Sequence, residues 1–129
     1  MLENLKKLEN YINSELSSKI HNSVIRNNEL LIEVGENDLT EVVQFIKSNE
    51  KLKFRQLIDV AGVDYPEEEK RFNLIYLFLS HENNSRLKLL VKFETSQTIN
   101  SITKIFPSAN WMEREVFDMY GIKFKNHPD

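Results

Sequence analysis

Residues 110–129 read NWMEREVFDMYGIKFKNHPD and carry the clearest structural pattern in the chain. Asn110 is a favourable helix N-cap, and Glu113, three residues later, can reach back to the backbone N–H of Asn110. Gly121 can adopt the left-handed conformation that ends many helices. The pattern therefore predicts a helix of about three turns over residues 111–120.

The predicted helix carries apolar side chains on more than one face. A helix on the surface of a monomer needs a single apolar stripe, so this distribution indicates contact with a second surface, of this chain or of a partner. Arg114 and Asp118 stand four residues apart and can form an ion pair, whereas Glu115 and Asp118 repel each other unless a cation lies between them. The alternative is an amphipathic helix whose charged face is simply solvated.

Residues 113–129 follow the order Glu-Arg-Glu-x-x-Asp-Met-Tyr-Gly-Ile-x-Phe-x-x-His-Pro-Asp and are preceded by Trp111. This order resembles the signature of the C subunit of NADH-quinone oxidoreductase, a family also called the 30-kilodalton subunit of respiratory complex I. Residues 57–66 (LIDVAGVDYP) and 72–80 (FNLIYLFLS) resemble the middle segment of that family. The resemblance covers about residues 54–129, and the first fifty residues match the family only in layout.

Members of this family generally continue beyond the His-Pro-Asp with a leucine- and arginine-rich segment and a tail that lies across neighbouring subunits. The present sequence stops at Asp129. We therefore expect residues 1–129 to form a single domain of the 30-kilodalton type that lacks this tail.

The resemblance implies a non-catalytic, cofactor-free subunit in the peripheral arm of a proton-pumping NADH-quinone oxidoreductase. Iron–sulfur clusters, FMN and quinone would belong to other subunits, and the partners would be the quinone-site subunit (D) and the terminal-cluster subunit (B). The protein would lie at the cytoplasmic face of the bacterial inner membrane and reach the membrane only through these partners. An equivalent subunit of a membrane-bound hydrogenase complex is the alternative. The expected partner-binding residues are Trp111, Glu113, Arg114, Glu115, Asp118, Tyr120 and His127.

The composition excludes several other kinds of site. A chain of 129 residues with 40% hydrophobic and 29% charged residues and a net charge of −3 is typical of one globular domain, without the basic patch of a nucleic-acid binder. The chain has no cysteine, which excludes disulfides and cysteine-ligated iron–sulfur clusters. Its three glycines form neither a Rossmann fingerprint nor a phosphate loop. No apolar run approaches the length of a membrane span, and no signal peptide pattern is present, so we expect a bacterial cytoplasmic protein.

Hydrophobic periodicity predicts an α+β fold, a two-layer sandwich with a mainly antiparallel sheet and helices packed on one side. The predicted order is α-β-β-α-β-β-β-α-α. The corresponding segments are residues 2–17, 20–26, 29–34, 39–49, 54–63, 72–79, 86–93, 99–106 and 111–120.

The strand predicted over residues 72–79 is apolar on both faces. Phe72, Leu74, Tyr76 and Phe78 point one way, whereas Ile75, Leu77 and Leu79 point the other way. A strand covered by helices on one side does not need a second apolar face, so we expect that face to meet another layer of this chain or a partner.

Two other functions remain as alternatives. Glu115 and Asp118 would lie on one helix face, close enough for one carboxyl to serve in a small acid–base enzyme. A sheet-based RNA-binding module is disfavoured because the aromatic strand lacks basic residues.

Asp59, which has apolar neighbours on its predicted face, is either a functional carboxylate or a strand-edge acid bonded to nearby backbone.

Overall fold

The computed structural model describes residues 2–94 and 98–128. Within these residues, helices and strands alternate much as the periodicity predicts. The elements are α1 (Leu2–Glu15), η1 (Ser17–Lys19), β1 (Ile20–Arg26), β2 (Glu29–Val34), α2 (Leu39–Ser48), β3 (Gln56–Asp64), β4 (Phe72–Ser80), β5 (Ser85–Phe93), β6 (Ile99–Asn100), α3 (Ala109–Tyr120) and β7 (Phe124–Lys125).

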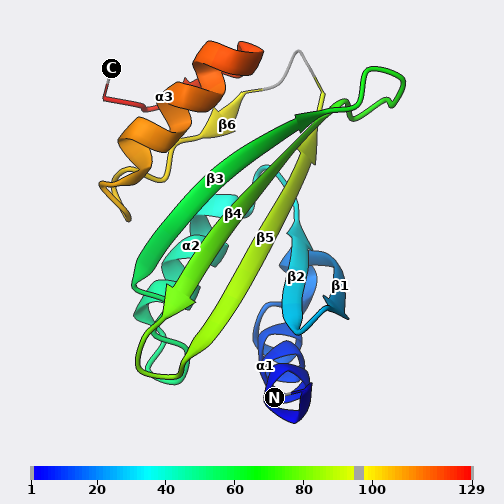
Figure 1. Cartoon of the computed structure of the whole chain (residues 1–129), viewed down its shortest axis with the longest axis vertical. Helices are drawn as coiled ribbons and strands as arrows, with labels where there is room; N and C mark the ends of the chain where they lie inside the picture. Colours follow the sequence, from blue (N-terminus) through cyan, green and yellow to red (C-terminus); the bar gives the residue numbers. More distant parts are fainter. Residues whose placement is uncertain (1, 95–97, 129) are drawn as a thin grey trace.

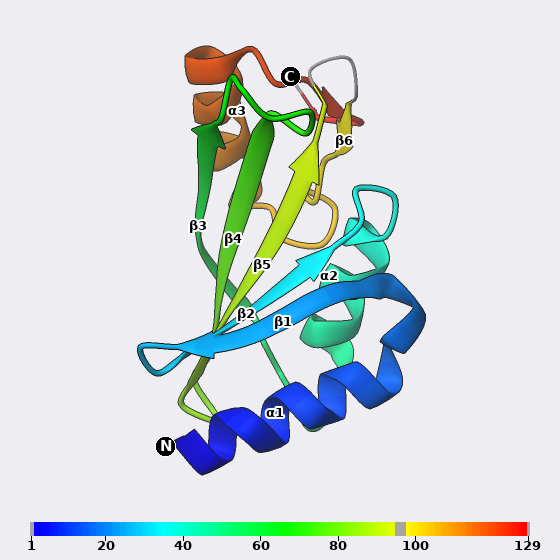
Figure 2. The same cartoon turned by 90° about the vertical axis from the view of Figure 1, so that its right-hand side faces the viewer.

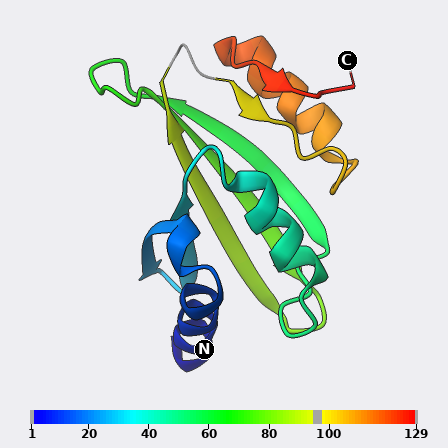
Figure 3. The ribbon, with the colours of Figure 1, turned by 180° about the vertical axis from the view of Figure 1, so that it is seen from behind.

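Five strands form one sheet in the order β1-β2-β5-β4-β3. Strands β2 and β5 run parallel, and the other neighbouring strands run antiparallel. Figure 1 shows β3, β4 and β5 as the long strands of the sheet, with β3 at its edge, and Figure 3 shows α2 across the face seen from behind. Helix α1 lies below β1 in Figure 2, and α3 packs against β3. The predicted α+β class with a mainly antiparallel sheet is confirmed.

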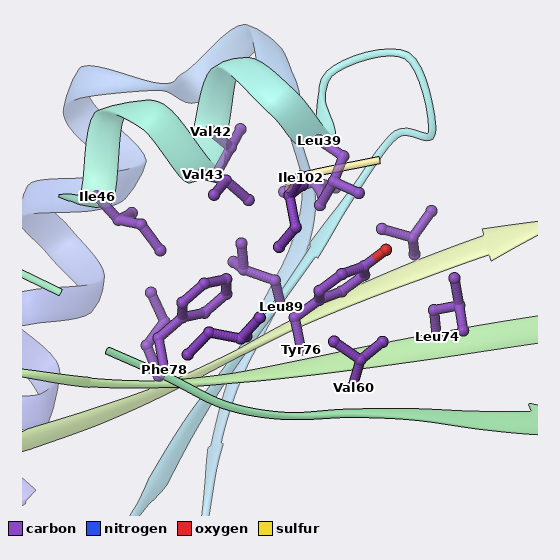
Figure 4. Packing of buried hydrophobic residues seen from close by; sticks show 14 of the residues in the cluster. Leu39, Val42, Val43, Ile46, Val60, Leu74, Tyr76, Phe78, Leu89 and Ile102 are labelled. Carbon is purple, nitrogen blue, oxygen red and sulfur yellow. The ribbon is translucent and has the colours of Figure 1, made fainter. Parts of the chain in front are cut away.

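The hydrophobic core fills the space between the helices and one face of the sheet. Tyr76 and Phe78 of β4 are fully buried and their rings stack, with centroids 6.5 Å apart. Helix α2 meets them with four fully buried aliphatic side chains (Figure 4). These are Leu39, Val42, Val43 and Ile46. The second helix therefore exists because its apolar stripe covers the sheet.

Within residues 2–94 and 98–128, no layer covers the outer face of β4. Residues along β4 alternate between buried and half-buried, and the half-buried set includes Ile75, Leu77 and Leu79. Figures 1 and 2 show no helix over this face in the described part of the chain. Of the two expected explanations, a second layer formed by the described residues is not found there. Coverage by a partner stays a prediction.

A β-bulge breaks the alternation of side chains along β3. The register with β4 shifts between Leu57 and Asp59, so Leu57 and Val60 are both buried. Asp59 is exposed, and its carboxylate accepts a hydrogen bond of 2.9 Å from the backbone N–H of Val60. Asp59 is therefore the strand-edge acid of the two interpretations, because simple alternation fails across a bulge.

The short helix predicted over residues 99–106 is wrong. Residues 99–100 form β6, which pairs in parallel with β7, and turns follow. The backbone N–H groups of Ile99 and Ser101 donate to the carbonyls of Lys123 and Lys125. Pairing with a segment more than twenty residues away thus satisfies the donors that a helix would have used. The helix-like spacing of apolar residues has a different cause. Ile102, Ile105 and Phe106 lie in a loop, and each turns its side chain into the core.

Candidate functional site on helix α3

Helix α3 ends as the sequence predicts but begins differently. Gly121 has φ 73°, and its N–H donates to the carbonyl of Phe117 at 2.7 Å, which is a left-handed helix cap. The helix begins at Ala109 with Ser108 as N-cap, and no side-chain hydrogen bond caps it. The predicted capping box of Asn110 and Glu113 is therefore wrong. Asn110 lies inside the first turn, and Glu113 binds elsewhere.

Glu113 faces inward from α3 and has no solvent-exposed surface. One carboxylate oxygen accepts a hydrogen bond of 2.6 Å from the Ser101 hydroxyl, and the other accepts one of 2.9 Å from the Ile102 N–H. The Ser101 hydroxyl also lies 2.8 Å from the Thr103 hydroxyl. Charge-assisted bonds of this kind are strong, so Glu113 fastens α3 to the loop that follows β6.

His127 closes the same cluster from the C-terminal segment. Its Nε2 lies 3.1 Å from the backbone carbonyl of Asn110, which can only accept, so Nε2 carries the proton in this contact. The same Nε2 lies 3.9 Å from a Glu113 carboxylate oxygen. The His127 side chain is only 12% exposed. Residues 101–103, α3 and residues 124–127 are therefore joined by one buried polar network.

Burial raises the pKa of Glu113 and of Tyr76 near it. Loss of solvent raises the pKa of Glu113 above its ordinary value, although the hydrogen bonds from Ser101 and Ile102 and the charge of His127 oppose the shift. Burial, helped by the nearby Glu113 carboxylate, also raises the pKa of Tyr76 well above its ordinary value. The network therefore holds Glu113 at an energetic cost when the carboxyl is charged.

The opposite face of α3 displays large apolar side chains to solvent. Trp111 is 76% exposed, Met119 66% and Phe117 46%. Between them lie exposed charged side chains. These are Arg114, Glu115 and Asp118. We call these six residues the α3 outer face.

Tyr120 belongs to the packed side of α3 and not to the outer face. Its ring meets Phe72 edge-on at a centroid distance of 6.5 Å. It also lies so close to Gly62 that a Cβ at that position would come within 3.0 Å of the ring. A glycine in β3 therefore gives the end of α3 room to approach the sheet.

A groove of about 420 Å³ runs between α3 and the C-terminal segment. We call it the α3 groove. It is lined by Glu113, Arg114, Phe117, Asp118, Lys123, Phe124 and His127. The groove thus joins the buried polar network to one edge of the α3 outer face.

The structure divides the predicted partner-binding residues into two groups. Trp111, Arg114, Glu115 and Asp118 are exposed together, whereas Tyr120 and His127 are half-buried and Glu113 is inside. Within this domain Glu113 holds the helix through Ser101 and Ile102, and its contact with a partner stays a prediction. Sequence reasoning missed the other members of the network and of the groove. They are Ser101, Ile102, Thr103, Phe117, Lys123 and Phe124.

Three other kinds of site were considered for the described residues: a metal site, a membrane-spanning helix and an acid–base pair. Within residues 2–94 and 98–128, no group of three or more His, Asp or Glu is placed to hold a metal ion. Among the described helices, none is long and apolar enough to cross a membrane. Glu115 and Asp118 both face solvent, and of the two only Asp118 lines the groove.

The family model and the relatives of this sequence indicate the same protein family. The model for the family described as respiratory-chain NADH dehydrogenase, 30 Kd subunit, matches residues 32–129. A protein of Chelativorans named as the C subunit of NADH-quinone oxidoreductase is 38% identical over 129 residues, which are 100% of this chain and 64% of that protein. A protein of the same name from Ruegeria pomeroyi is 46% identical over 101 residues, 78% of this chain and 50% of that protein. The chain thus spans less than two thirds of these relatives, and the similarity reaches residues 1–50, where the sequence suggested only a common layout.

Two solved structures share the fold. A trypsin-resistant fragment of Nqo5 superposes with a TM-score of 0.79 at 24% identity, covering 95% of this chain and 98% of that chain. A subunit of a membrane-bound sulfane sulfur reductase, described as an archaeal respiratory membrane complex, superposes with a TM-score of 0.81 at 18% identity. That match covers 95% of this chain and 71% of the other. At these identities the two structures establish the fold alone.

Proposed function

Because the chain belongs to the family of the 30-kilodalton subunit of respiratory-chain NADH dehydrogenase, we propose that it is a structural subunit of the peripheral arm of a proton-pumping NADH-quinone oxidoreductase. It supports electron transfer from NADH to quinone by assembly and does no chemistry alone. Iron–sulfur clusters, FMN and quinone belong to other subunits. The protein sits on the cytoplasmic side of the bacterial inner membrane and touches the membrane only through its partners.

The observation that carries this proposal is the α3 outer face. Trp111, Phe117 and Met119 are exposed beside both acidic and basic side chains. Tryptophan, methionine and arginine are enriched at protein interfaces, and interface hot spots are centred on such residues. A helix that is merely solvated gains nothing from a tryptophan that is 76% exposed. We therefore assign the outer face to docking against neighbouring subunits, the quinone-site subunit and the terminal-cluster subunit.

The inner side of the helix supports this assignment. Glu113 fixes α3 to Ile102 and Ser101, and the Gly121 cap fixes where the helix ends. A rigid display lowers the entropy lost on binding. The buried network is thus the support of a docking helix and not a catalytic centre.

The structure supports the alternative functions less well than it supports the proposed one. An acid–base enzyme that used Glu115 and Asp118 would need both in one enclosed site, but both face solvent. The fold shared with a respiratory sulfane sulfur reductase complex is compatible with a subunit of a related complex, such as a membrane-bound hydrogenase. The sequence relatives favour NADH-quinone oxidoreductase, because their identity of 38% over 129 residues is well above the 18% of that structure.

The test replaces one charged residue of the outer face at a time in the source bacterium. Arg114→Ala and Asp118→Ala should each leave thermal unfolding of the isolated domain nearly unchanged, because exposed charged side chains contribute little to stability. The same variants should lower the amount of subunit in the assembled complex and its quinone reductase activity, because removing one member of a pair desolvated at an interface costs about 2 to 5 kcal/mol.

Arg26→Ala is the matched control, because Arg26 is an exposed arginine at the end of β1, remote in the fold from α3. It should assemble normally. Normal assembly and activity of both α3 variants would refute docking through the outer face.

A further inference from the structure

We propose that the α3 groove receives an acidic, partly apolar segment of a partner subunit, whose carboxylate pairs with Lys123. This inference rests on the function proposed above and names the chemistry of one contact. The groove lies between α3 and residues 123–127 and has a volume of about 420 Å³. Sites of roughly 300–1,000 Å³ bind small ligands, so a groove of this size accepts one or two side chains and not a whole helix.

Two aromatic rings give the groove an apolar part. Phe117 comes from α3 and is 46% exposed, and Phe124 comes from β7 and is half-buried. Both line the groove, one from each wall. An occupant that carries an apolar side chain would remove Phe117 from water, and burial of apolar surface is the main favourable term in association.

The charges of the groove are unequal on its two walls. On α3, Arg114 and Asp118 lie one helical turn apart, so their opposite charges offset each other. Glu113 contributes no accessible acceptor, because it is fully buried and both of its oxygens already accept hydrogen bonds. The accessible charge of α3 along the groove is therefore close to neutral.

The opposite wall carries Lys123, whose side chain is exposed and lines the groove. Other lysines of the chain meet carboxylates at short range, such as Lys53 with Glu82 at 2.9 Å and Lys88 with Glu29 at 3.0 Å. Within the described residues, the Lys123 ammonium group forms no hydrogen bond or ion pair. The groove therefore presents an uncompensated cation beside two aromatic rings.

Charge complementarity then selects the occupant. A basic side chain would bring a second cation next to Lys123, and like charges at an interface are strongly unfavourable. A carboxylate can accept charge-assisted hydrogen bonds from the ammonium group while an apolar neighbour in its sequence covers Phe117. The groove thus fits a partner segment with an aspartate or glutamate next to an apolar residue.

The first experiment identifies the occupant in the assembled complex. A photo-crosslinking benzoylphenylalanine is placed at position 117 of the full protein, and the linked peptide is sequenced by mass spectrometry. The same group at position 119 is the control, because Met119 is exposed on α3 but does not line the groove. We expect position 117 to capture a subunit peptide that contains aspartate or glutamate beside the crosslinked residue. A captured peptide without an acidic residue would refute the inference.

The second experiment reverses charges. Lys123→Glu should lower incorporation of the subunit into the complex by about tenfold or more, because like charges juxtaposed at an interface cost at least about 1.4 kcal/mol. Lys125→Glu is the control, since Lys125 is exposed two residues away and does not line the groove. Its incorporation should stay within about twofold of wild type. Lys substituted for the acidic residue of the captured peptide should restore incorporation of Lys123→Glu. Thermal unfolding of both isolated variants checks that they fold.

The outcomes separate the inference from the proposed function. If Lys123→Glu assembles as well as Lys125→Glu while Arg114→Ala fails to assemble, the groove assignment is wrong and docking through the outer face stands. If neither crosslinking position captures a subunit of the complex and Arg114→Ala assembles normally, the proposed function fails, and the inference fails with it.

Discussion

Helices α2 and α3 are similar in length but are held to the sheet by different forces. Helix α2 buries four aliphatic side chains and exposes Glu41, Gln44 and Ser48. Helix α3 buries Glu113 together with Ala109 and Val116, while its tryptophan is 76% exposed. Burial of the aliphatic stripe is the main contact that orients α2, and Lys47 adds a hydrogen bond to the Ile105 carbonyl. The orientation of α3 places an acid inside and an indole outside, so hydrophobic burial within this domain does not explain its outer face.

A cavity under α2 should cause a large loss of stability. Leu39→Ala removes a fully buried side chain from the α2 stripe and should lower the free energy of unfolding by about 2 to 5 kcal/mol. Gln44→Ala, on the exposed side of the same helix, should change it by less than about 0.5 kcal/mol. Urea unfolding of the isolated domain measures both. Equal midpoints would mean that α2 is not held by its apolar stripe.

A smaller loss of stability is expected at Gly121, the residue that ends α3. Gly121→Val should lower the free energy of unfolding by about 1 to 2 kcal/mol, because a β-branched residue tolerates positive φ poorly. The cost comes from the backbone alone, since a Cβ at this position meets no atom within 4 Å among the described residues. Gly121→Asn is the control and should cost less, because asparagine adopts the left-handed conformation more readily. If valine and asparagine are equally tolerated in thermal unfolding, φ at residue 121 is not the cause.

The same contrast shows what the sequence could predict. The α2 stripe and the Gly121 cap are local patterns, since each depends on residues within a few turns, and both are confirmed. The five strands β1 to β5 are local patterns as well, and in the turn between β1 and β2 both Asn27 and Asn28 have positive φ. The expectation that Trp111, Arg114, Glu115 and Asp118 meet a partner came from the family resemblance, and the structure leaves all four exposed.

The role of Glu113 could not be predicted, because its partners lie elsewhere in the chain. Ser101 and Ile102 reach α3 only because β6 pairs with β7, and each of those strands has two residues. No local rule connects residues 101 and 113. The capping box offered Glu113 a nearby backbone partner, but the more distant bonds are in a dry site, where hydrogen bonds to a charge are stronger.

The pH dependence of Glu113 gives a smaller and more specific effect. Its pKa is raised in the folded state by burial, so the neutral carboxyl stabilises the fold below the ordinary carboxyl pKa, and this contribution is lost as pH rises through the raised value. Glu113→Gln cannot titrate and keeps one acceptor and one donor for Ile102 and Ser101. The advantage of wild type over this variant should therefore shrink as the pH is raised from the ordinary carboxyl pKa toward neutrality.

Melting temperatures of the two proteins across this range test the sign. Gln44→Ala serves as a non-titrating control whose difference from wild type should not change with pH. An advantage of wild type that grows with pH would mean that hydrogen bonding outweighs burial at Glu113 and that the charged carboxylate stabilises the attachment of α3.

The substitution with the smallest expected effect on stability is the most informative about how α3 differs from α2. Trp111→Ala removes the largest side chain of α3, yet that side chain is 76% exposed, so the free energy of unfolding should change by less than about 0.5 kcal/mol. Phe106→Ala removes an aromatic ring that is 3% exposed and should cost about 3 to 5 kcal/mol. Urea midpoints of the two variants, at unchanged slope, measure the difference. A loss for Trp111→Ala as large as that for Phe106→Ala would mean that the indole packs on this domain, and the outer face would then need no partner. A negligible loss leaves an exposed tryptophan that the domain does not use, and its contribution must then be measured in the assembled complex.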